Sequence, residues 1–422
     1  MIFDTAIGGL DRPRQGTAEW RRALSLRSAG VVYALVVLVG VLAVTSAFQG
    51  RPPYLSDTNV SNILDQSALI GILAVFMTIT LITGNFDLSV ASTAALSGTV
   101  ALKLVDAHGV VVALIAALLV GTLVGLVNAV LVQKVGVNAF IVTLGTLTAV
   151  RGVVQAILNG QSITATDTGF HTFTTAHLAV DRTVAFAAGA VLLAVGTLVF
   201  VRGRRGLSRT WIEPMLAGLG IVLVAAASPA LLHQSVPVWI MLVLALLAGA
   251  VLRYTVIGRN LYAVGGNAEA ARLSGINVDR YKMGAFALNG TVAALVGVLY
   301  AGRFNSVDPT VLTGGELTVI AAAVLGGTSL FGGSGYVSKS VVGTLILFTL
   351  SNGFNVLNIG SNYQNVVQGS VLVAAAALYT ASSPRGRSFL RSSGLIRRSK
   401  HRKPLTDTGP SSLILDARDT GS

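Results

Sequence analysis

The sequence contains no cysteine, and only 11% of its 422 residues are charged. Without thiols the chain forms no disulfide bond, no thiolate metal site and no cysteine nucleophile. Its five histidines show no HExxH pattern and no paired-ligand spacing, so we expect no metal site. A soluble globular protein has about a quarter of its residues charged. The composition therefore argues against a soluble protein.

Motifs for several other classes are missing as well. The chain has no Gly-Lys pair and so no GxxxxGK[ST] loop, which excludes nucleotide hydrolysis by that route. It has no GxSxG nucleophile motif. It also lacks a TVGYG filter and a helix with arginine at every third position, which argues against a potassium channel and a voltage sensor.

Long apolar runs make up most of the chain, which is 53% hydrophobic with a mean hydropathy of +0.74. A membrane span needs about 20 mostly apolar residues, and lipid leaves helices as the expected form. We therefore predict an all-α polytopic membrane protein. Twelve runs qualify as spans: 29–48, 66–83, 88–105, 110–132, 139–158, 183–201, 214–232, 236–254, 283–302, 316–331, 338–358 and 364–381.

The basic residues indicate how these spans are oriented. Of the thirty, five lie in 1–28, four in 202–213, five in 253–282 and nine in 382–422. The predicted spans place these regions on one side, and the positive-inside rule makes that side cytoplasmic. Both termini are then cytoplasmic, and the polar lead 1–28 is not expected to be a cleaved signal.

The net charge of +13 does not indicate a nucleic-acid partner, because the charges lie in short segments between apolar runs. The tail 382–422 is polar and basic. We expect it to be disordered and to lie against anionic lipid headgroups. The transmembrane domain is predicted at 29–381.

An internal repeat connects two distant segments. Residues 87–99 and 316–328 share the order acid, Leu, hydroxyl residue, Val, and then Leu, small residue, Gly, Thr. Val-Gly-Thr-Leu follows both, at 120–123 and 342–345. If the pair 183–232 is an extra helix pair, ten spans remain and divide five and five into an inverted repeat. The alternative is chance recurrence of small residues that let membrane helices pack closely.

Ionisable residues inside spans indicate functional sites because they are costly in lipid. Asp87 and Glu316 follow glycines, as at a broken helix, and each either caps a half-helix or contacts a solute. Lys103 and Arg151 are the other two ionisable residues singled out inside the predicted spans. Asparagines such as Asn289 either bind a polar solute or join helices. The candidate substrate-path residues are Asp87, Ser89, Asn128, Arg151, Glu316, Asn352 and Asn355.

The polar segment 255–282 contains a predicted short helix at 265–276. Asn267 is suited to be its N-cap, Glu269 favours the first turn, and Gly275 supplies a left-handed C-cap. A helix this short is not stable alone in water, so it must dock on a partner. The predicted docking residues are Asn267, Glu269, Ala270, Ala271, Arg272, Leu273 and Gly275.

The order Glu269-Ala270-Ala271-x-x-x-Gly275 resembles the EAA loop of ABC-importer permeases. Residues 263–280 are similar to the coupling loop of monosaccharide permeases of the ribose and xylose type. The similarity covers nearly all of 54–381 and is carried by the stretches 54–75, 86–90, 140–152 and 324–335.

The extra pair 183–232 and the stretch 159–169 resemble the xylose type more than the shorter ribose type. Ala91, Phe331 and Asn85 depart from the usual pattern. Ala91 and Asn85 flank Asp87 and bear on its role in sugar handling. They leave the coupling loop untouched.

The resemblance implies a permease subunit that imports a monosaccharide, xylose or a related pentose, through the cell membrane. It implies a homodimer, an extracytoplasmic sugar-binding protein, and an ATP-binding subunit that docks on 265–276 and drives alternating access. ATP would be bound by that partner, so no cofactor is expected in this chain.

Two alternatives remain at this stage. An ion-coupled secondary transporter would use Asp87 and Glu316 and need no ATPase, and the predicted docking helix argues against it. An enzyme that modifies membrane-embedded sugars would need a nucleophile and a base, and the sequence offers no such constellation. We therefore expect the chain not to be an enzyme.

Overall fold

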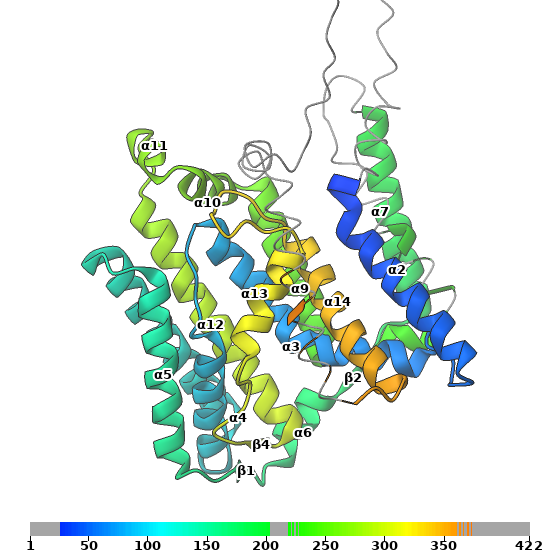
Figure 1. Ribbon diagram of the computed structural model, residues 1–422, viewed down its shortest axis with the longest axis horizontal. Helices are drawn as coiled ribbons and strands as arrows, with labels where there is room; N and C mark the ends of the chain where they lie inside the picture. The colour runs from blue at the N-terminus through cyan, green and yellow to red at the C-terminus, as the bar shows by residue number, and fades with distance from the viewer. Residues whose placement is uncertain are drawn as a thin grey trace, which may run out of the picture. The chain divides into compact units, whose positions relative to one another are not determined.

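The computed structural model describes residues 26–202, 218–220, 222, 225–226 and 228–360, with single positions at 363, 366, 369, 370 and 373 (Figure 1). Predictions for residues 1–25 of the lead, for 203–217 and for the tail 382–422 concern residues outside these ranges. So do part of the predicted span 214–232 and most of the predicted span 364–381.

Within the described residues, seven helices are long and apolar enough to cross a membrane. The predicted all-α class is confirmed, whereas the count of twelve is not. Together with the shorter ones, the α-helices of the described residues are α2 (Leu26–Phe48), α3 (Asp57–Ile82), α4 (Val90–Val130), α5 (Ala139–Leu158), α6 (Thr168–Thr175), α7 (Arg182–Arg202), α9 (Val236–Tyr254), α10 (Val256–Gly266), α11 (Ala268–Leu273), α12 (Val278–Phe304), α13 (Gly315–Leu325) and α14 (Val337–Val356).

Short elements complete the chain. A π-helical turn, η1 (Leu131–Val135), extends α4, and a 3-10 turn, η3 (Pro229–Leu232), precedes α9. Strand β1 (Ile163–Thr164) pairs antiparallel with β4 (Ser306–Val307), and β2 (His177–Ala179) pairs antiparallel with β3 (His233–Ser235).

Helix α3 is the centre of the bundle, because every residue from Ser67 to Ile82 is buried. It begins at Asp57, so the predicted start at residue 66 was wrong. The Ser56 hydroxyl caps it by accepting from the Asn59 amide at 3.4 Å, and Asp57 in the first turn favours the positive helix end. Polar residues near the start made this part of the helix look like a loop.

Helix α4 reverses direction at Gly109, whose φ of 78° and ψ of 168° are not helical. Both halves pack against α12 through glycines. A Cβ on Gly98 would lie 2.7 Å from the Gly297 carbonyl oxygen and 3.5 Å from Ala301, and one on Gly121 would lie 2.5 Å from the Gly290 carbonyl oxygen. Farther along the second half, Gly125 lies against Phe286. The two halves therefore run in opposite directions, as predicted for two spans at 88–105 and 110–132.

Helix α13 ends at Leu325, so the predicted span 316–331 was wrong beyond that point. Gly326 and Gly327 end the helix, and Gly327 has a φ of +85°. Its 11 residues extend roughly 16 Å, about half of a bilayer's hydrocarbon core. A loop then connects it to α14. Helix α13 is therefore a half-helix.

Contacts with neighbouring helices define the direction of α13. Gly326 packs beside Lys339 and Gly343 beside Ala322, so α13 is antiparallel to α14. Helix α14 is antiparallel to α3, because Ser340 meets Thr78 at 2.7 Å, while Asn352, nearer its end, donates to Asn59, near the start of α3, at 2.9 Å.

Helix α12 is antiparallel to α3 as well. The Arg303 side chain near its end donates to the Asp65 carbonyl, and Asn289 in its middle donates to Asp87 beyond the end of α3. The first half of α4 runs parallel to α12 and therefore antiparallel to α3. Helix α13 runs parallel to α3, because both are antiparallel to α14. The predicted opposite directions of the two repeated segments are confirmed.

The extra pair 183–232 is described only in part. Gly189 of α7 lies against Val222 and Gly218. Ala185, Ala225 and Leu232 form a small apolar cluster of their own. The placement of this pair outside the transport core stays a prediction.

We expect Gly121→Ala to destabilise the bundle. The new Cβ would lie 2.5 Å from both the Ala294 Cβ and the Gly290 carbonyl oxygen, and overpacking of this kind costs about 1–3 kcal/mol. Thermal unfolding in detergent should show a lower melting temperature. The matched control is Gly145→Ala on α5, where a Cβ meets no atom of the described residues within 4 Å. Equal melting temperatures for the two variants would contradict this packing.

Candidate functional site

Asp87 lies in the non-helical segment between α3 and α4 and is 1% exposed. Its Oδ1 accepts from the Ser89 amide at 3.0 Å and from the Ser89 hydroxyl at 2.6 Å. Its Oδ2 accepts from the Asn289 amide group at 2.9 Å. Asn128 donates to the Ser89 hydroxyl at 2.9 Å and accepts from Thr146 at 2.6 Å. One buried polar network thus joins α4, α5 and α12.

This geometry agrees with the capping alternative for Asp87. The carboxylate binds the Ser89 amide at the start of α4, where the helix dipole favours negative charge. Burial of a carboxylate is costly unless hydrogen bonds compensate it. The side chains of Ser89 and Asn289 supply that compensation, so the chain itself occupies both carboxylate oxygens.

Glu316 lies in the first turn of α13, after Gly314 with its φ of +80°. Its Oε2 is buried and has no hydrogen-bond partner among the described residues. The Arg151 guanidinium donates to the carbonyl oxygens of Pro309 at 3.2 Å and Val311 at 2.7 Å. It also interacts favourably with the charges of Glu316 and Asp308. Unlike Asp87, Glu316 keeps an oxygen for another donor.

The two acid-bearing helix starts meet inside the bundle. A Cβ on Gly315, at the start of α13, would lie 3.7 Å from the Ala91 Cβ, at the start of α4, and 3.8 Å from Ile70 in the middle of α3. Two positive helix ends therefore face one region, each with its own carboxylate. Such discontinuous helices line the substrate sites of membrane transporters.

The predicted path residues form separate groups. Asp87, Ser89 and Asn128 lie together, and Arg151 lies near Glu316. Asn352 bonds instead to Asn59 near the start of α3, and Asn355 lies exposed further along α14. Asn289 was predicted either to bind a polar solute or to join helices, and its bond to Asp87 agrees with the second alternative. Thr146 was not predicted, and its only signal in the sequence is a polar group in an apolar run.

At one end of the bundle the segment 255–282 holds two helices rather than one. Helix α10 was not predicted, because Gly258, Gly265 and Gly266 resemble loop residues. The Thr255 hydroxyl caps it by accepting from the Gly258 amide at 3.2 Å. The predicted bounds 265–276 were also wrong, since α11 spans Ala268–Leu273.

The predicted caps of α11 are confirmed. The Asn267 side chain accepts from the Ala270 amide at 3.0 Å, and Gly275 has a φ of +80°. The Ile276 amide donates to the Ala271 carbonyl at 3.0 Å, and the Gly275 amide donates to the Arg272 carbonyl at 2.9 Å. These two bonds make a Schellman motif, which ends the helix sharply.

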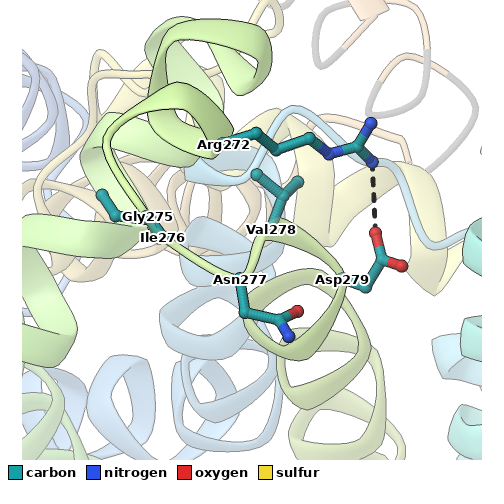
Figure 2. A pocket seen from close by; sticks show the side chains of 6 residues that line it. All are labelled: Arg272, Gly275, Ile276, Asn277, Val278 and Asp279. Atoms are coloured by element: carbon teal, nitrogen blue, oxygen red, sulfur yellow. Dashed lines mark hydrogen bonds and ion pairs between the residues drawn. The ribbon is translucent and has the colours of Figure 1, made fainter.

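Helix α11 presents most of its residues to solvent. Ala271 is 4% exposed and packs with Val264 and Val278, whereas Leu273 is 86% exposed. The other predicted docking residues are exposed too: Asn267, Glu269, Ala270, Arg272 and Gly275. The turn after α11 forms a pocket of about 320 Å³ lined by Arg272, Gly275, Ile276, Asn277, Val278 and Asp279 (Figure 2). An exposed leucine beside a polar pocket is suited to contact with another protein.

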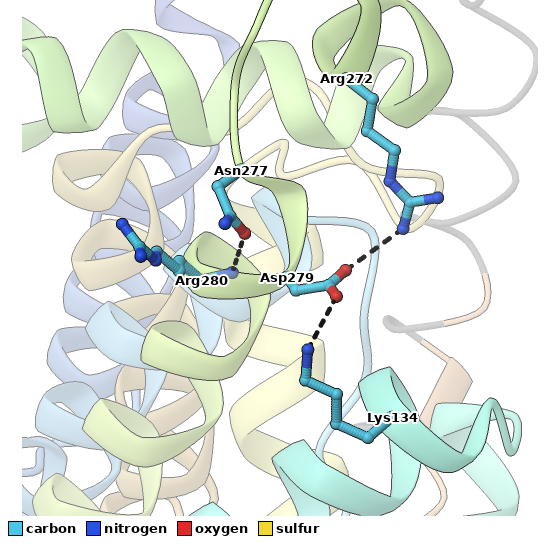
Figure 3. A network of polar contacts seen from close by, with 5 residues as sticks. All are labelled: Lys134, Arg272, Asn277, Asp279 and Arg280. Atoms are coloured by element: carbon cyan, nitrogen blue, oxygen red, sulfur yellow. Dashed lines mark hydrogen bonds and ion pairs between the residues drawn. The ribbon is translucent and has the colours of Figure 1, made fainter.

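A charged network holds α11 to its surroundings (Figure 3). Asp279 at the start of α12 pairs with Lys134 of η1 at 3.1 Å and with Arg272 of α11 at 3.2 Å. The Arg280 amide is capped by the Asn277 side chain at 3.1 Å. Exposed pairs contribute only about 0.2–1 kcal/mol each, so this network orients α11 without holding it rigidly.

A bundle of membrane helices with broken helices inside and an exposed capped helix at one end is typical of a permease. The family model described as branched-chain amino acid transport system, permease component, matches residues 59–376. The chain belongs to this family, and within it to the monosaccharide permeases of ABC importers, which are membrane proteins and not enzymes.

The relatives differ in the sugar they are named for. The ribose import permease protein RbsC of Escherichia coli strain K12 is 37% identical over 343 residues, covering 81% of this chain and 90% of that protein. The xylose transport system permease protein XylH of the same strain is 34% identical over 390 residues, covering 88% and 96%. The L-arabinose ABC transporter permease protein AraH of Azospirillum brasilense is 34% identical over 351 residues, covering 83% and 86%.

These identities correct the expectation that the chain is nearest to the xylose type. Identity is higher to the ribose permease, although the xylose permease aligns over more of both chains. No solved structure matches the chain. Membership in the family implies an ATP-binding subunit and a substrate-binding protein as partners.

We expect Asp87→Ala to lower stability more than Asp87→Asn. Alanine leaves the Ser89 amide and the Asn289 side chain without their acceptor, and a buried unsatisfied group costs about 1–3 kcal/mol. Asparagine keeps one oxygen for Ser89, and its new amide can donate to the Asn289 Oδ1, which has no partner in the part of the chain that the structure describes. Thermal unfolding in detergent checks this. Equal losses in both variants would show that the charge, rather than the hydrogen bonds, stabilises the site.

Proposed function

We propose that this chain is the membrane subunit of a pentose importer whose separate ATP-binding subunit docks on α11. One observation carries the proposal. Helix α11 has six residues, too few for a stable isolated helix, yet it is fully capped and exposes Leu273. Such a surface is suited to a partner cleft, and family membership makes an ATPase the partner. ATP stays with that partner, so the chain itself needs no cofactor.

The transport cycle follows from alternating access. Two copies of the chain form the pathway, and ATP binding moves the α11 of each. The end of the bundle with α11 faces the cytoplasm. This agrees with the five basic residues of 253–282, which the positive-inside rule predicts on the cytoplasmic side. A sugar-binding protein delivers the solute to the opposite end. In this arrangement the termini are cytoplasmic.

The sugar is proposed to cross the bundle past the place where the starts of α4 and α13 meet. Glu316 is the residue we assign to the sugar, because its buried Oε2 has no partner among the described residues and can accept a hydrogen bond from a sugar hydroxyl. Arg151 supports the loop before it. Ribose, xylose and arabinose, for which the relatives are named, are all pentoses, and this supports a pentose as the solute.

Ion-coupled transport through Asp87 and Glu316 has less support. Both oxygens of Asp87 already accept hydrogen bonds from Ser89 and Asn289, which compete with binding of a cation there. The capped helix α11 would also have no purpose without a partner.

Gly275→Asp tests the proposed function. A side chain at φ +80° is strained by roughly 1 kcal/mol and also stands in the docking surface. We expect the variant to insert in the membrane but to lose both sugar uptake and the ATP hydrolysis stimulated by the binding protein. Uptake of labelled ribose, xylose and arabinose into proteoliposomes with the ATP-binding subunit measures this.

Gly275→Asn is the matched control for charge, because asparagine and aspartate have nearly the same size and both tolerate a left-handed backbone. Loss of uptake in both variants assigns the effect to a side chain in the docking surface, whereas normal uptake with asparagine assigns it to the negative charge of the aspartate. Near wild-type uptake by Gly275→Asp would reject α11 as the docking helix.

Single cysteines in this cysteine-free chain test the orientation. Ser162 lies beside β1, at the end of the bundle where α12 finishes, and Ser274 follows α11 at the other end. Both are exposed. We expect a membrane-impermeant maleimide to label Ser162→Cys in intact cells and Ser274→Cys only after permeabilisation. The reverse pattern would invert the orientation.

A further inference from the structure

Helix α10 ends on the backbone of two other segments. A Cβ on Gly265 would lie 1.6 Å from the Ile82 carbonyl oxygen, at the end of α3, and 2.8 Å from the Gly333 nitrogen, in the loop between α13 and α14. No side chain can be accommodated at Gly265. The backbone of α10 is therefore in direct contact with both segments, and Figure 1 shows α10 beside this loop.

Hydrogen bonds hold the same three segments together. The Gly333 amide donates to the Ile82 carbonyl at 2.9 Å, and the Tyr262 hydroxyl donates to the Gly335 carbonyl at 2.8 Å. A Cβ on Gly332 would lie 2.7 Å from the Gly265 carbonyl oxygen and 2.9 Å from the Gly84 Cα. We call this contact of 262–266 with 82–84 and 332–335 the backbone junction.

The Tyr262 hydroxyl is suited to be a permanent donor in this junction. Burial, with a smaller contribution from Tyr336, raises the pKa of Tyr262 above its ordinary value. The hydroxyl therefore stays protonated at neutral pH, and the bond to Gly335 does not depend on small changes in pH.

The junction connects the two parts of the molecule that the proposed function uses. On one side, a single residue, Asn267, separates α10 from α11. On the other side, Ile82 leads into the segment that carries Asp87. The loop 332–335 follows the half-helix α13, which begins at Gly315 against Ala91.

We propose that the backbone junction transmits the movement of α11 to the starts of α4 and α13, with Gly265 and Tyr262 as its positioning residues. This inference rests on the proposed function. Direct backbone contacts transmit displacement well, because no side chain lies between the segments to change rotamer and absorb it. The exposed ion pairs of Asp279 are a weaker connection.

The test compares two pairs of variants in the assembled transporter. Gly265→Ala introduces the clash with Ile82, and its control Gly266→Ala places a Cβ where no atom from 26–202 or 228–360 lies within 4 Å. Tyr262→Phe removes only the bond to Gly335. Its control is Tyr281→Phe on α12, which removes the 2.6 Å bond that the Asn260 side chain of α10 donates to the Tyr281 hydroxyl. Both of these residues lie outside the backbone junction.

Two quantities are measured in proteoliposomes that contain the ATP-binding subunit and the binding protein: copurification of the ATPase, and ATP hydrolysed per pentose imported. We expect all four variants to retain the ATPase. For Tyr262→Phe the ratio of ATP to pentose should rise about three- to ten-fold, the effect of one lost hydrogen bond. For Gly265→Ala it should rise further, and for both controls it should stay at the wild-type value.

The outcomes distinguish this inference from the proposed function. If Tyr262→Phe keeps the wild-type ratio, the junction does not transmit the movement, even if Gly265→Ala fails to fold. Equal effects of Tyr262→Phe and Tyr281→Phe overturn the inference as well. If the wild-type chain binds no ATPase at all, the proposed function fails, and the inference fails with it.

Discussion

Two helix starts meet inside the apolar bundle, and the rest of the structure depends on how their polarity is compensated. Each helix start has amide groups without helical partners and the positive end of a dipole. At α4, Asp87 accepts from the Ser89 amide and is itself held by Asn289 of α12. At α13, Glu316 lies in the first turn. The repeated acid in the sequence therefore has a physical reason in both copies.

The two sites differ in what they leave available. Around Asp87 the donors and acceptors of Ser89, Asn128 and Thr146 largely satisfy one another, which makes this site part of the core. Glu316 retains a buried oxygen without a partner among the described residues. A symmetric pattern in sequence has thus become an asymmetric pair, in which donors of the chain bind both oxygens of Asp87 while one oxygen of Glu316 has no such donor among the described residues.

The end of the bundle that carries α11 follows a different principle. Helix α11 is held by local caps, by one buried alanine and by exposed ion pairs, each of which contributes little stability. Helix α10, only one residue away, is fixed by backbone contacts with the end of α3 and the loop after α13. A weakly held helix next to a closely packed one is a suitable arrangement for passing an external force inward.

The sequence by itself determined features that depend on neighbouring residues. Apolar length predicted α5 and α9, and the caps of α11 could be predicted because Asn267 and Gly275 act within one helical turn. Tertiary structure alone decided that Gly326 packs against the backbone of Lys339 and Gly343 against that of Ala322. It also decided that Asn128 meets Ser89, and that Gly265 lies on Ile82. These contacts join residues far apart in the chain, and a periodic apolar pattern shows which residues are buried without showing which atoms they meet.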